Sequence, residues 1–245
     1  MDKNTILIAI IALLSGFIGG FLLANSLNRS EINAMRAQTA VSSQPSNSGA
    51  KNAGDEETLS PQEIKAKIEE ADKNPDNLSY QKNLGIGLYR YGAMKQDEDV
   101  ISESARILTR ANAIDPKDFD VLSTLGNAYF DLGFAKKDPA GFQKARDLYQ
   151  KALAIREDAD VRTDLGISYL VSEQPDLAKA AAELEKVGAA NPRHDRSMQF
   201  LAQVYIKQNR LPDAEKTIAR VKEISPGNPA IDDLNKQLAA AKSSK

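Results

Sequence analysis

The sequence predicts an all-α chain in which about four helical hairpins stack as a solenoid, with capping helices, behind one N-terminal transmembrane helix. The main observation is a motif, Leu-Gly/Ala-x-x-Leu/Tyr, that returns after 41, 40 and 36 residues. Repeated units of about this length pack on their neighbours and build solenoids. A long apolar run near the N-terminus predicts the membrane helix. The copies of the motif begin at Leu84, Leu125, Leu165 and Leu201.

The composition fits helices and argues against several kinds of function. The chain has 32 basic and 34 acidic side chains, a balance that gives no support to nucleic-acid binding. It has no cysteine, and His194 is its one histidine. A thiolate metal site, a cysteine nucleophile and a histidine-rich metal cluster are therefore not expected. We expect no catalytic residue, no metal and no cofactor.

The N-terminal segment reads as a short tail, residues 1–4, followed by a transmembrane helix over residues 5–27. Ile6 to Ala24 is almost wholly apolar, and roughly 20 such residues span a hydrocarbon core of roughly 30 Å. A cleaved signal peptide is the alternative, but it usually ends at a small-x-small site. Leu22 stands where the outer small residue belongs, which favours an uncleaved anchor.

The short N-terminal tail, more than the flanking charges, favours an N-in orientation of this segment. Lys3 lies before the apolar run, and Arg29 and Arg36 lie after it, so the positive-inside rule alone gives nearly a tie. The very short N-terminal tail favours placing it inside. The repeats would then lie in the periplasm of a bacterium, anchored to the inner membrane. The reversed topology would give an adaptor that faces the cytosol.

Small residues recur every fourth position along the expected membrane helix. A Gly-x-x-x-Gly spacing lets two membrane helices approach closely, and this predicts a homodimer or helix docking through the membrane segment. The alternative is that glycine and alanine are simply common in membrane helices. The small residues are Ala12, Gly16, Gly20 and Ala24.

Residues 28–58 are expected to form a flexible linker, and a capping helix is expected over residues 60–73. The linker is rich in Ser, Gln, Asn, Ala and Gly, and buries too little apolar surface to fold. Ser60, Pro61 and Glu63 then form a helix start, with Ser at the N-cap and Glu three residues later. A last capping helix is expected over residues 229–242.

The repeated motif, with later alanines and a proline turn, resembles the tetratricopeptide repeat family, whose members are built from pairs of antiparallel helices. The resemblance implies four repeats, at residues 78–117, 119–157, 158–192 and 193–226. The first two repeats are about seven residues longer than the family pattern, which predicts either an extra turn in each helix of these hairpins or a longer loop around Lys95–Asp99 and Lys136–Pro139. Longer helices are favoured because an apolar pattern continues through Tyr89, Tyr91 and Met94, and likewise through Phe130 and Phe134. The third repeat is about two residues longer, which predicts a loop near Ser172–Leu177.

The resemblance also implies a peptide groove lined by the first helix of each repeat. Tyr89, Phe130, Leu170 and Ile206 are equivalent and all apolar, so they either face a peptide or pack on the neighbouring repeat. The longer first two repeats predict taller walls for that half of the groove. The candidate groove residues are Lys82, Ile86, Tyr89, Arg90, Asn127, Phe130, Asp131, Ile167, Leu170, Gln203, Ile206 and Lys207.

The sequence therefore predicts a membrane-anchored scaffold that binds a protein or peptide, in envelope assembly or as a helper for exported proteins. A cytochrome c maturation-type factor that holds apoprotein is an alternative. The carboxylate clamp known from some members of the family is not expected, because Ile86 stands where that clamp needs Asn.

Overall fold

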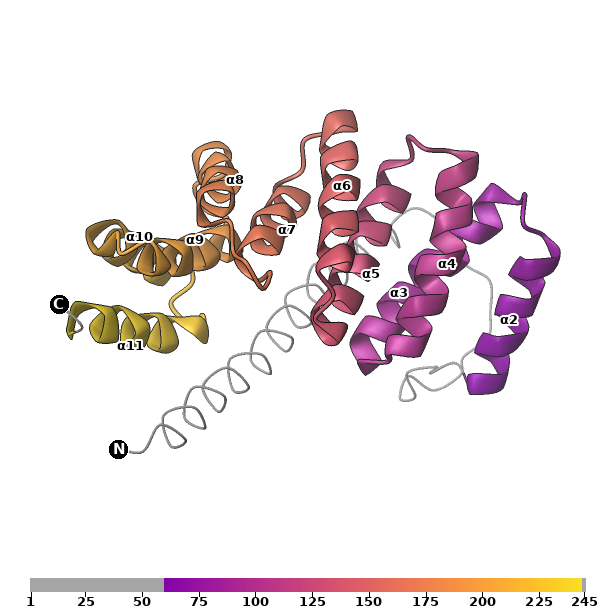
Figure 1. Cartoon of the computed structure of the whole chain (residues 1–245), viewed down its shortest axis with the longest axis horizontal. Helices are drawn as coiled ribbons and strands as arrows, with labels where there is room; N and C mark the ends of the chain where they lie inside the picture. Colours follow the sequence, from indigo (N-terminus) through magenta and orange to yellow (C-terminus); the bar gives the residue numbers. More distant parts are fainter. Residues whose placement is uncertain (1–59, 244–245) are drawn as a thin grey trace, which may run out of the picture. The chain divides into compact units, whose positions relative to one another are not determined.

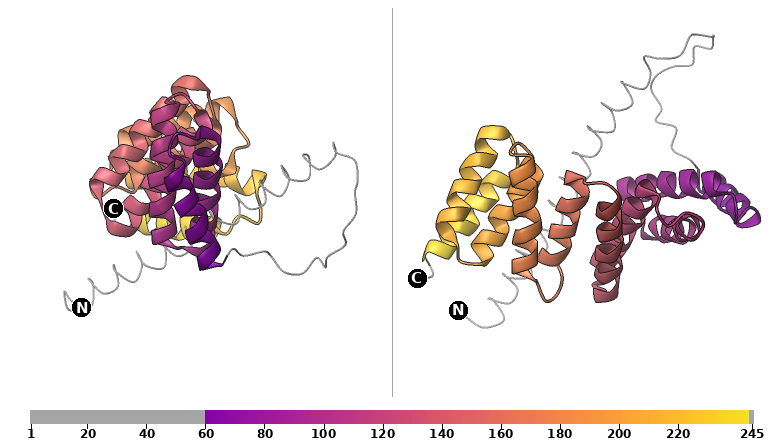
Figure 2. Two further views of the ribbon diagram at one scale, coloured as in Figure 1. Left: turned by 90° about the vertical axis from the view of Figure 1, so that its right-hand side faces the viewer. Right: turned by 90° about the horizontal axis from the view of Figure 1, so that it is seen from above.

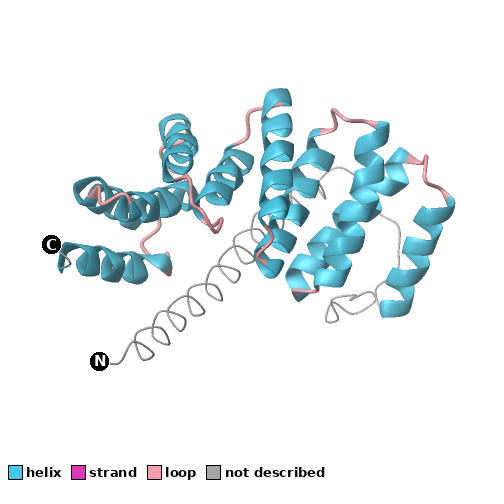
Figure 3. Cartoon of the chain, in the orientation of Figure 1, coloured by secondary structure: helices cyan, strands magenta, loops and turns pink. Residues whose placement is uncertain are grey.

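The computed structural model describes residues 60–243, which fold into ten α-helices and no strand (Figure 1). The chain divides into two units, Met1–Leu59 and Ser60–Lys245, and all the described residues belong to the second. The predicted all-α solenoid is therefore confirmed for residues 60–243, as the helical ribbons in Figure 3 show. The helices are α2 (Pro61–Lys73), α3 (Leu78–Lys95), α4 (Glu98–Ile114), α5 (Phe119–Lys136), α6 (Pro139–Ile155), α7 (Ala159–Leu170), α8 (Leu177–Ala190), α9 (Asp195–Lys207), α10 (Leu211–Ile224) and α11 (Ala230–Ser243).

The helices form four hairpins, each with a first (A) helix and a second (B) helix. The pairs are α3–α4, α5–α6, α7–α8 and α9–α10, and the first three B helices also contact the A helix of the next hairpin. The A helices contact one another in the order α3, α5, α7 and α9. The two further views in Figure 2 follow the same succession of hairpins. Residues 60–243 thus form a layer of A helices and a layer of B helices.

Each A helix begins at an equivalent capping residue, seven positions before the motif leucine. The side chains of Asn77, Asp118, Asp158 and His194 each accept a hydrogen bond from a backbone N–H of the helix that follows. Such caps satisfy N–H groups that have no partner within the helix. The predicted capping box at Ser60 and Glu63 is also present at the start of α2.

The glycine of the motif lets the two helices of a hairpin approach closely. A Cβ added at Gly85 would lie 2.6 Å from Leu108 Cγ, and one at Gly126 would lie 2.7 Å from Tyr149 Cε1. At Gly166 it would lie 2.8 Å from Leu184 Cγ. These distances are shorter than atomic contacts allow, so the side chain of the B helix takes the space that a larger residue would fill.

The extra residues of the first two hairpins lengthen the helices, as predicted. The helices α3 and α5 have 18 residues each, and α4 and α6 have 17 each. In the last two hairpins the A helices have 12 and 13 residues and the B helices 14 each. In the third hairpin the loop spans residues 171–176.

The C-terminal helix α11 closes the stack through an apolar face. Ile231, Leu234 and Leu238 are buried, and Ile231 packs in a cluster with Met198 of α9 and Val221 of α10. The opposite face of α11 is polar, as the end of a solenoid requires for solubility.

Within residues 60–243 no helix is both long enough and apolar enough to cross a membrane. The predicted membrane helix, the linker and the small residues Ala12, Gly16, Gly20 and Ala24 all fall on residues 1–59, outside the described part of the chain.

Candidate functional site

The structure places the predicted groove residues along the A helices, but it leaves only some of them accessible. Five are buried, five are half-buried and two are exposed. The buried ones are Tyr89, Phe130, Ile167, Leu170 and Gln203; the half-buried ones are Lys82, Ile86, Asn127, Asp131 and Ile206; the exposed ones are Arg90 and Lys207.

Three of the four equivalent apolar positions pack inside the solenoid. Tyr89 on α3 is 6% exposed, and its hydroxyl donates a hydrogen bond of 2.8 Å to Asp131 Oδ2 on α5. Phe130 stacks on Phe134 and lies edge-on to Phe142, with ring centroids 6.5 and 5.6 Å apart. Their burial supports the packing alternative for these side chains. The half-buried Ile206 is the one of the four that reaches the surface.

Lys82 is engaged within the chain. Its Nζ donates to both carboxylate oxygens of Asp118, at 3.0 and 2.7 Å, and to Asp120 at 3.0 Å. Burial acts against the charge on Lys82, but its hydrogen bonds to the two carboxylates outweigh this and raise its pKa. Burial likewise acts against the charge on Asp118, but the hydrogen bonds from Lys82 and the Val121 backbone lower its pKa. Lys82 therefore joins α3 to α5.

The surface of the A-helix layer that carries the predicted groove residues is called the A face. It is closed at the third hairpin. Ile167 and Leu170 on α7 are 1% and 4% exposed, and Thr163 is fully buried. Asp164 on α7 forms an ion pair with Arg196 on α9, and their side chains are 9% and 11% exposed. The two A helices are thus drawn together, and the side chains predicted to line this part of the groove are inside.

The accessible part of the A face lies on α3 and α5. Ile86 and Arg90 reach the surface from α3, and Asn127 and Asp131 do so from α5. Tyr149 of α6 donates a hydrogen bond of 2.9 Å to Asn127 Oδ1, which orients that amide. Beyond the closed third hairpin, α9 adds Ile206 and Lys207 at its C-terminal end.

Comparison with known proteins identifies the repeat. Residues 173–238 match the family model of the tetratricopeptide repeat. The chain carries tetratricopeptide repeats. The structure extends that fold over hairpins that the family model does not cover, because all four share the motif and the capping position.

Several known proteins are similar to this tetratricopeptide-repeat chain. The mitochondrial import receptor subunit TOM20-4 of Arabidopsis thaliana is 31% identical over 127 residues, which are 49% of this chain and 62% of the receptor subunit. The match thus spans less than two thirds of that protein. The crystal structure of YrrB, a repeat protein with an unusual peptide-binding site, has a TM-score of 0.54 at 18% identity and covers 74% of this chain and 84% of YrrB. MamA has a TM-score of 0.53 at 21% identity, with 67% and 81% covered. Both structures share the fold.

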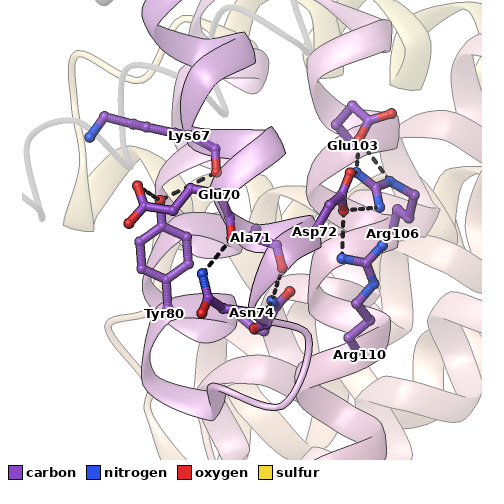
Figure 4. A network of polar contacts seen from close by, with 10 residues as sticks. Lys67, Glu70, Ala71, Asp72, Asn74, Tyr80, Glu103, Arg106 and Arg110 are labelled. Carbon is purple, nitrogen blue, oxygen red and sulfur yellow. Dashed lines mark hydrogen bonds and ion pairs between the residues drawn. The ribbon is translucent and has the colours of Figure 1, made fainter.

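Polar contacts seat α2 on the first tetratricopeptide hairpin (Figure 4). Asp72 of α2 accepts hydrogen bonds from Arg106 and Arg110 of α4, at 2.7 and 2.6 Å, and these bonds lower the Asp72 pKa. Tyr80 of α3 donates to Glu70, and burial together with this bond raises its pKa to about 12. The buried amide of Gln81 donates to backbone carbonyls of α2 and its C-cap. The sequence reasoning missed this network, because its partners are separated by up to 38 residues.

The single histidine caps a helix. His194 Nδ1 accepts a hydrogen bond from the Ser197 backbone N–H, and Nε2 lies 3.2 Å from Asp160 Oδ1 on α7. The sequence could have suggested this role, since His194 aligns with Asn77, Asp118 and Asp158. Among residues 60–243 no group of three or more His, Asp or Glu side chains is arranged to hold a metal ion.

Proposed function

We propose that the chain is a protein-interaction scaffold whose accessible A face, on α3 and α5, binds a segment of a partner protein. The observation that carries the proposal is the contrast between this face and the closed face of α7. Ile86 offers apolar surface, and Arg90, Asn127 and Asp131 offer charges and an amide beside it. A site of this kind combines apolar contact with a few polar groups that fix the bound segment.

The similar proteins support the proposal at the level of function class. TOM20-4 is an import receptor subunit, and YrrB has a peptide-binding site. A helical scaffold with no expected catalytic group fits that class better than it fits an enzyme.

We further propose that residues 5–27 anchor the scaffold in the bacterial inner membrane, with the repeats in the periplasm. The apolar, uncharged run of Ile6 to Ala24 supports the anchor. In that place the scaffold would serve envelope assembly or help exported proteins. The alternatives are a cytochrome c maturation-type factor that holds apoprotein, or a cytosol-facing adaptor if the topology is reversed.

Site-specific photo-crosslinking in cells tests the binding face. A crosslinking amino acid placed at Ile86 or Asn127 should capture the same partner, because both positions lie on the accessible face. The matched control is Lys151, an exposed residue on the B helix α6. Equal capture from Lys151 would contradict the proposal.

Reporter fusions at the C-terminus test the anchor and its orientation. Alkaline phosphatase should be active and a fluorescent protein dark if the repeats lie in the periplasm. A cytoplasmic result would reject the periplasmic roles. Separately, a Gly16→Ile/Gly20→Ile variant that self-associates as well as the parent would reject a dimer through the membrane helix.

A further inference from the structure

Within residues 60–243 the layer of A helices starts at α3, and no other helix of these residues covers one face of α3. Gly87 lies three positions after the motif leucine, where α5, α7 and α9 carry Ala128, Ser168 and Val204. Those three residues are fully buried, whereas Gly87 is exposed and a Cβ added to it would meet nothing within 4 Å. The residue at this repeat position is therefore buried in α5, α7 and α9 and exposed in α3.

A second position repeats the pattern. Asn83 of α3 is exposed, while its equivalents Asp164 and Phe200 are buried and Thr124 is half-buried. The reason lies in the contacts of the layer. The helix α5 is preceded by α3, α7 by α5, and α9 by α7, so each later A helix has a preceding one against which this face packs. No helix of residues 60–243 precedes α3 in that layer.

The layer of B helices, by contrast, is already extended in front of α3. The helix α2 contacts α3, just as α4 contacts α5 and α6 contacts α7, and Figure 1 shows α2 at this end of the repeats. It therefore takes the place of a preceding B helix. Its A-helix counterpart is the element that would cover Asn83 and Gly87.

The uncovered face has a definite chemistry. The exposed residues Asn83, Gly87, Arg90 and Met94 follow one another at three- or four-residue steps and so form one stripe, the α3 stripe. Met94 is 52% exposed. Among residues 60–243 Arg90 has no ion-pair partner, and α3 contains no acidic residue. The stripe thus combines backbone that is exposed at Gly87, a guanidinium without an ion-pair partner at Arg90 and an apolar side chain at Met94.

If the α3 stripe served only to keep this end of the solenoid soluble, it would not need a glycine and an arginine. An exposed glycine inside a helix costs about 1 kcal/mol relative to alanine, and a polar helix former would fit at residue 87. Glycine instead permits another backbone to come close, as Gly141 of α6 does for the Gly133 backbone of α5 within the second hairpin. Arginine binds carboxylates in a bidentate manner that a lysine cannot reproduce.

We propose that the α3 stripe docks one amphipathic α-helix of a partner protein, which takes the place of the A helix before α3. The helix carries an acidic side chain that meets Arg90 and apolar side chains that pack over Gly87 and against Met94. This rests on the proposed function as a binding scaffold, and it names the partner as an acidic amphipathic helix.

The test uses the full chain, an mRNA-display library of helix-forming peptides and binding by fluorescence anisotropy. Enriched peptides should carry Asp or Glu beside apolar residues at helical spacing. Gly87→Gln should weaken their binding roughly tenfold or more, because the new side chain fills the space over the stripe. Gly188→Gln is the control, since a Cβ at Gly188 of α8 also meets nothing within 4 Å; its binding should stay within about twofold.

Substitutions that reverse or keep the charge of Arg90 test its role in binding. Arg90→Glu should lower the affinity for acidic helices roughly tenfold, and Arg90→Lys should lose less. Four results would overturn the proposal: no enrichment, enriched peptides without acids, binding that survives Gly87→Gln, or self-association that Gly87→Gln abolishes, which would make the occupant a second copy. Failure here with specific crosslinks from Asn127 would leave the proposed function standing. Failure of those crosslinks would reject the binding face itself.

Discussion

The first two hairpins, α3–α4 and α5–α6, and the last two, α7–α8 and α9–α10, share a motif but are held together differently. In each long hairpin the two helices approach closely at glycines near the turn that joins them, here called the tip of the hairpin. The Cβ of an alanine at Gly92 would lie 3.0 Å from the Ile101 backbone nitrogen, and at Gly141 it would lie 2.7 Å from Gly133 Cα. The ion pair between A helices is more buried in the short hairpins, where Asp164 and Arg196 are 9% and 11% exposed, than in the long ones, where Asp118 and Lys82 are 15% and 26% exposed.

The difference teaches how an inserted turn is accommodated in a repeat. Two extra helical turns can stay packed only if the added ends of both helices approach closely, and glycine provides that approach. Where no turn is added, the contact between the A helices of the two hairpins carries the more buried ion pair. In this chain that contact closes the A face at α7 and leaves α3 and α5 accessible.

The largest expected effect concerns the short half. Asp164→Ala removes one partner of a buried ion pair and leaves Arg196 uncompensated, so it should lower the free energy of unfolding by about 3 kcal/mol. Urea denaturation followed by circular dichroism measures it. Asp72→Ala, whose carboxylate is 42% exposed, should cost much less. Equal losses in the two variants would remove the distinction between the two kinds of ion pair.

The long half is tested at its glycine tip. Gly141→Ala should destabilise the chain by about 2 kcal/mol, because the new Cβ meets the Gly133 backbone, which cannot move aside as a side chain can. The same denaturation assay applies. Gly188→Ala is the matched control and should stabilise by roughly 0.5–1 kcal/mol, since helix propensity alone changes there. A neutral Gly141→Ala would mean that the tips do not need close contact.

The sequence was sufficient for the fold of residues 60–243, because that fold depends on local signals that repeat. The motif leucines, the capping box at Ser60 and the lengths of the first two repeats each determine a neighbouring stretch of chain. The extra apolar residues beyond Leu88 and Tyr129 predicted longer helices, and α3 to α6 have them.

The candidate site could be predicted only in part, because exposure depends on distant partners. Tyr89 and Phe130 occupy positions that face a groove in the family pattern. Both are nevertheless buried, because Tyr89 bonds to Asp131 and Phe130 packs against Phe142. Nothing near Tyr89 in the sequence indicates Asp131, which lies 42 residues away. The pairing of Lys82 with Asp118 is of the same kind.

That pairing gives a pH-dependent prediction for the long half. Lys82→Met should lower stability by about 1 kcal/mol at neutral pH, and Asp118 still caps α5. The pKa of Asp118 is lowered on folding, so its contribution is complete above the ordinary carboxyl pKa and is lost as the pH falls through the folded-state pKa. The pKa of Lys82 is raised, so its contribution is lost only as the pH rises through that higher value.

Denaturation of the parent and Lys82→Met across this range measures the pair. The two stabilities should differ at neutral pH and converge in acid. A difference that persists after Asp118 is protonated would assign the loss to packing of the lysine stem rather than to the ion pair.

The smallest effect compares the turns between A and B helices. Lys137 at the end of α5 and Asn209 after α9 both adopt left-handed backbone angles, with φ of 51° and 58°. Glycine adopts this conformation without steric cost, and asparagine tolerates it better than lysine. Lys137→Gly should therefore stabilise by roughly 0.5–1 kcal/mol, and Asn209→Gly by less. The thermal midpoint measures both. An equal gain at the two sites would show that the turn of the long hairpin is no more strained than the turn of the short one.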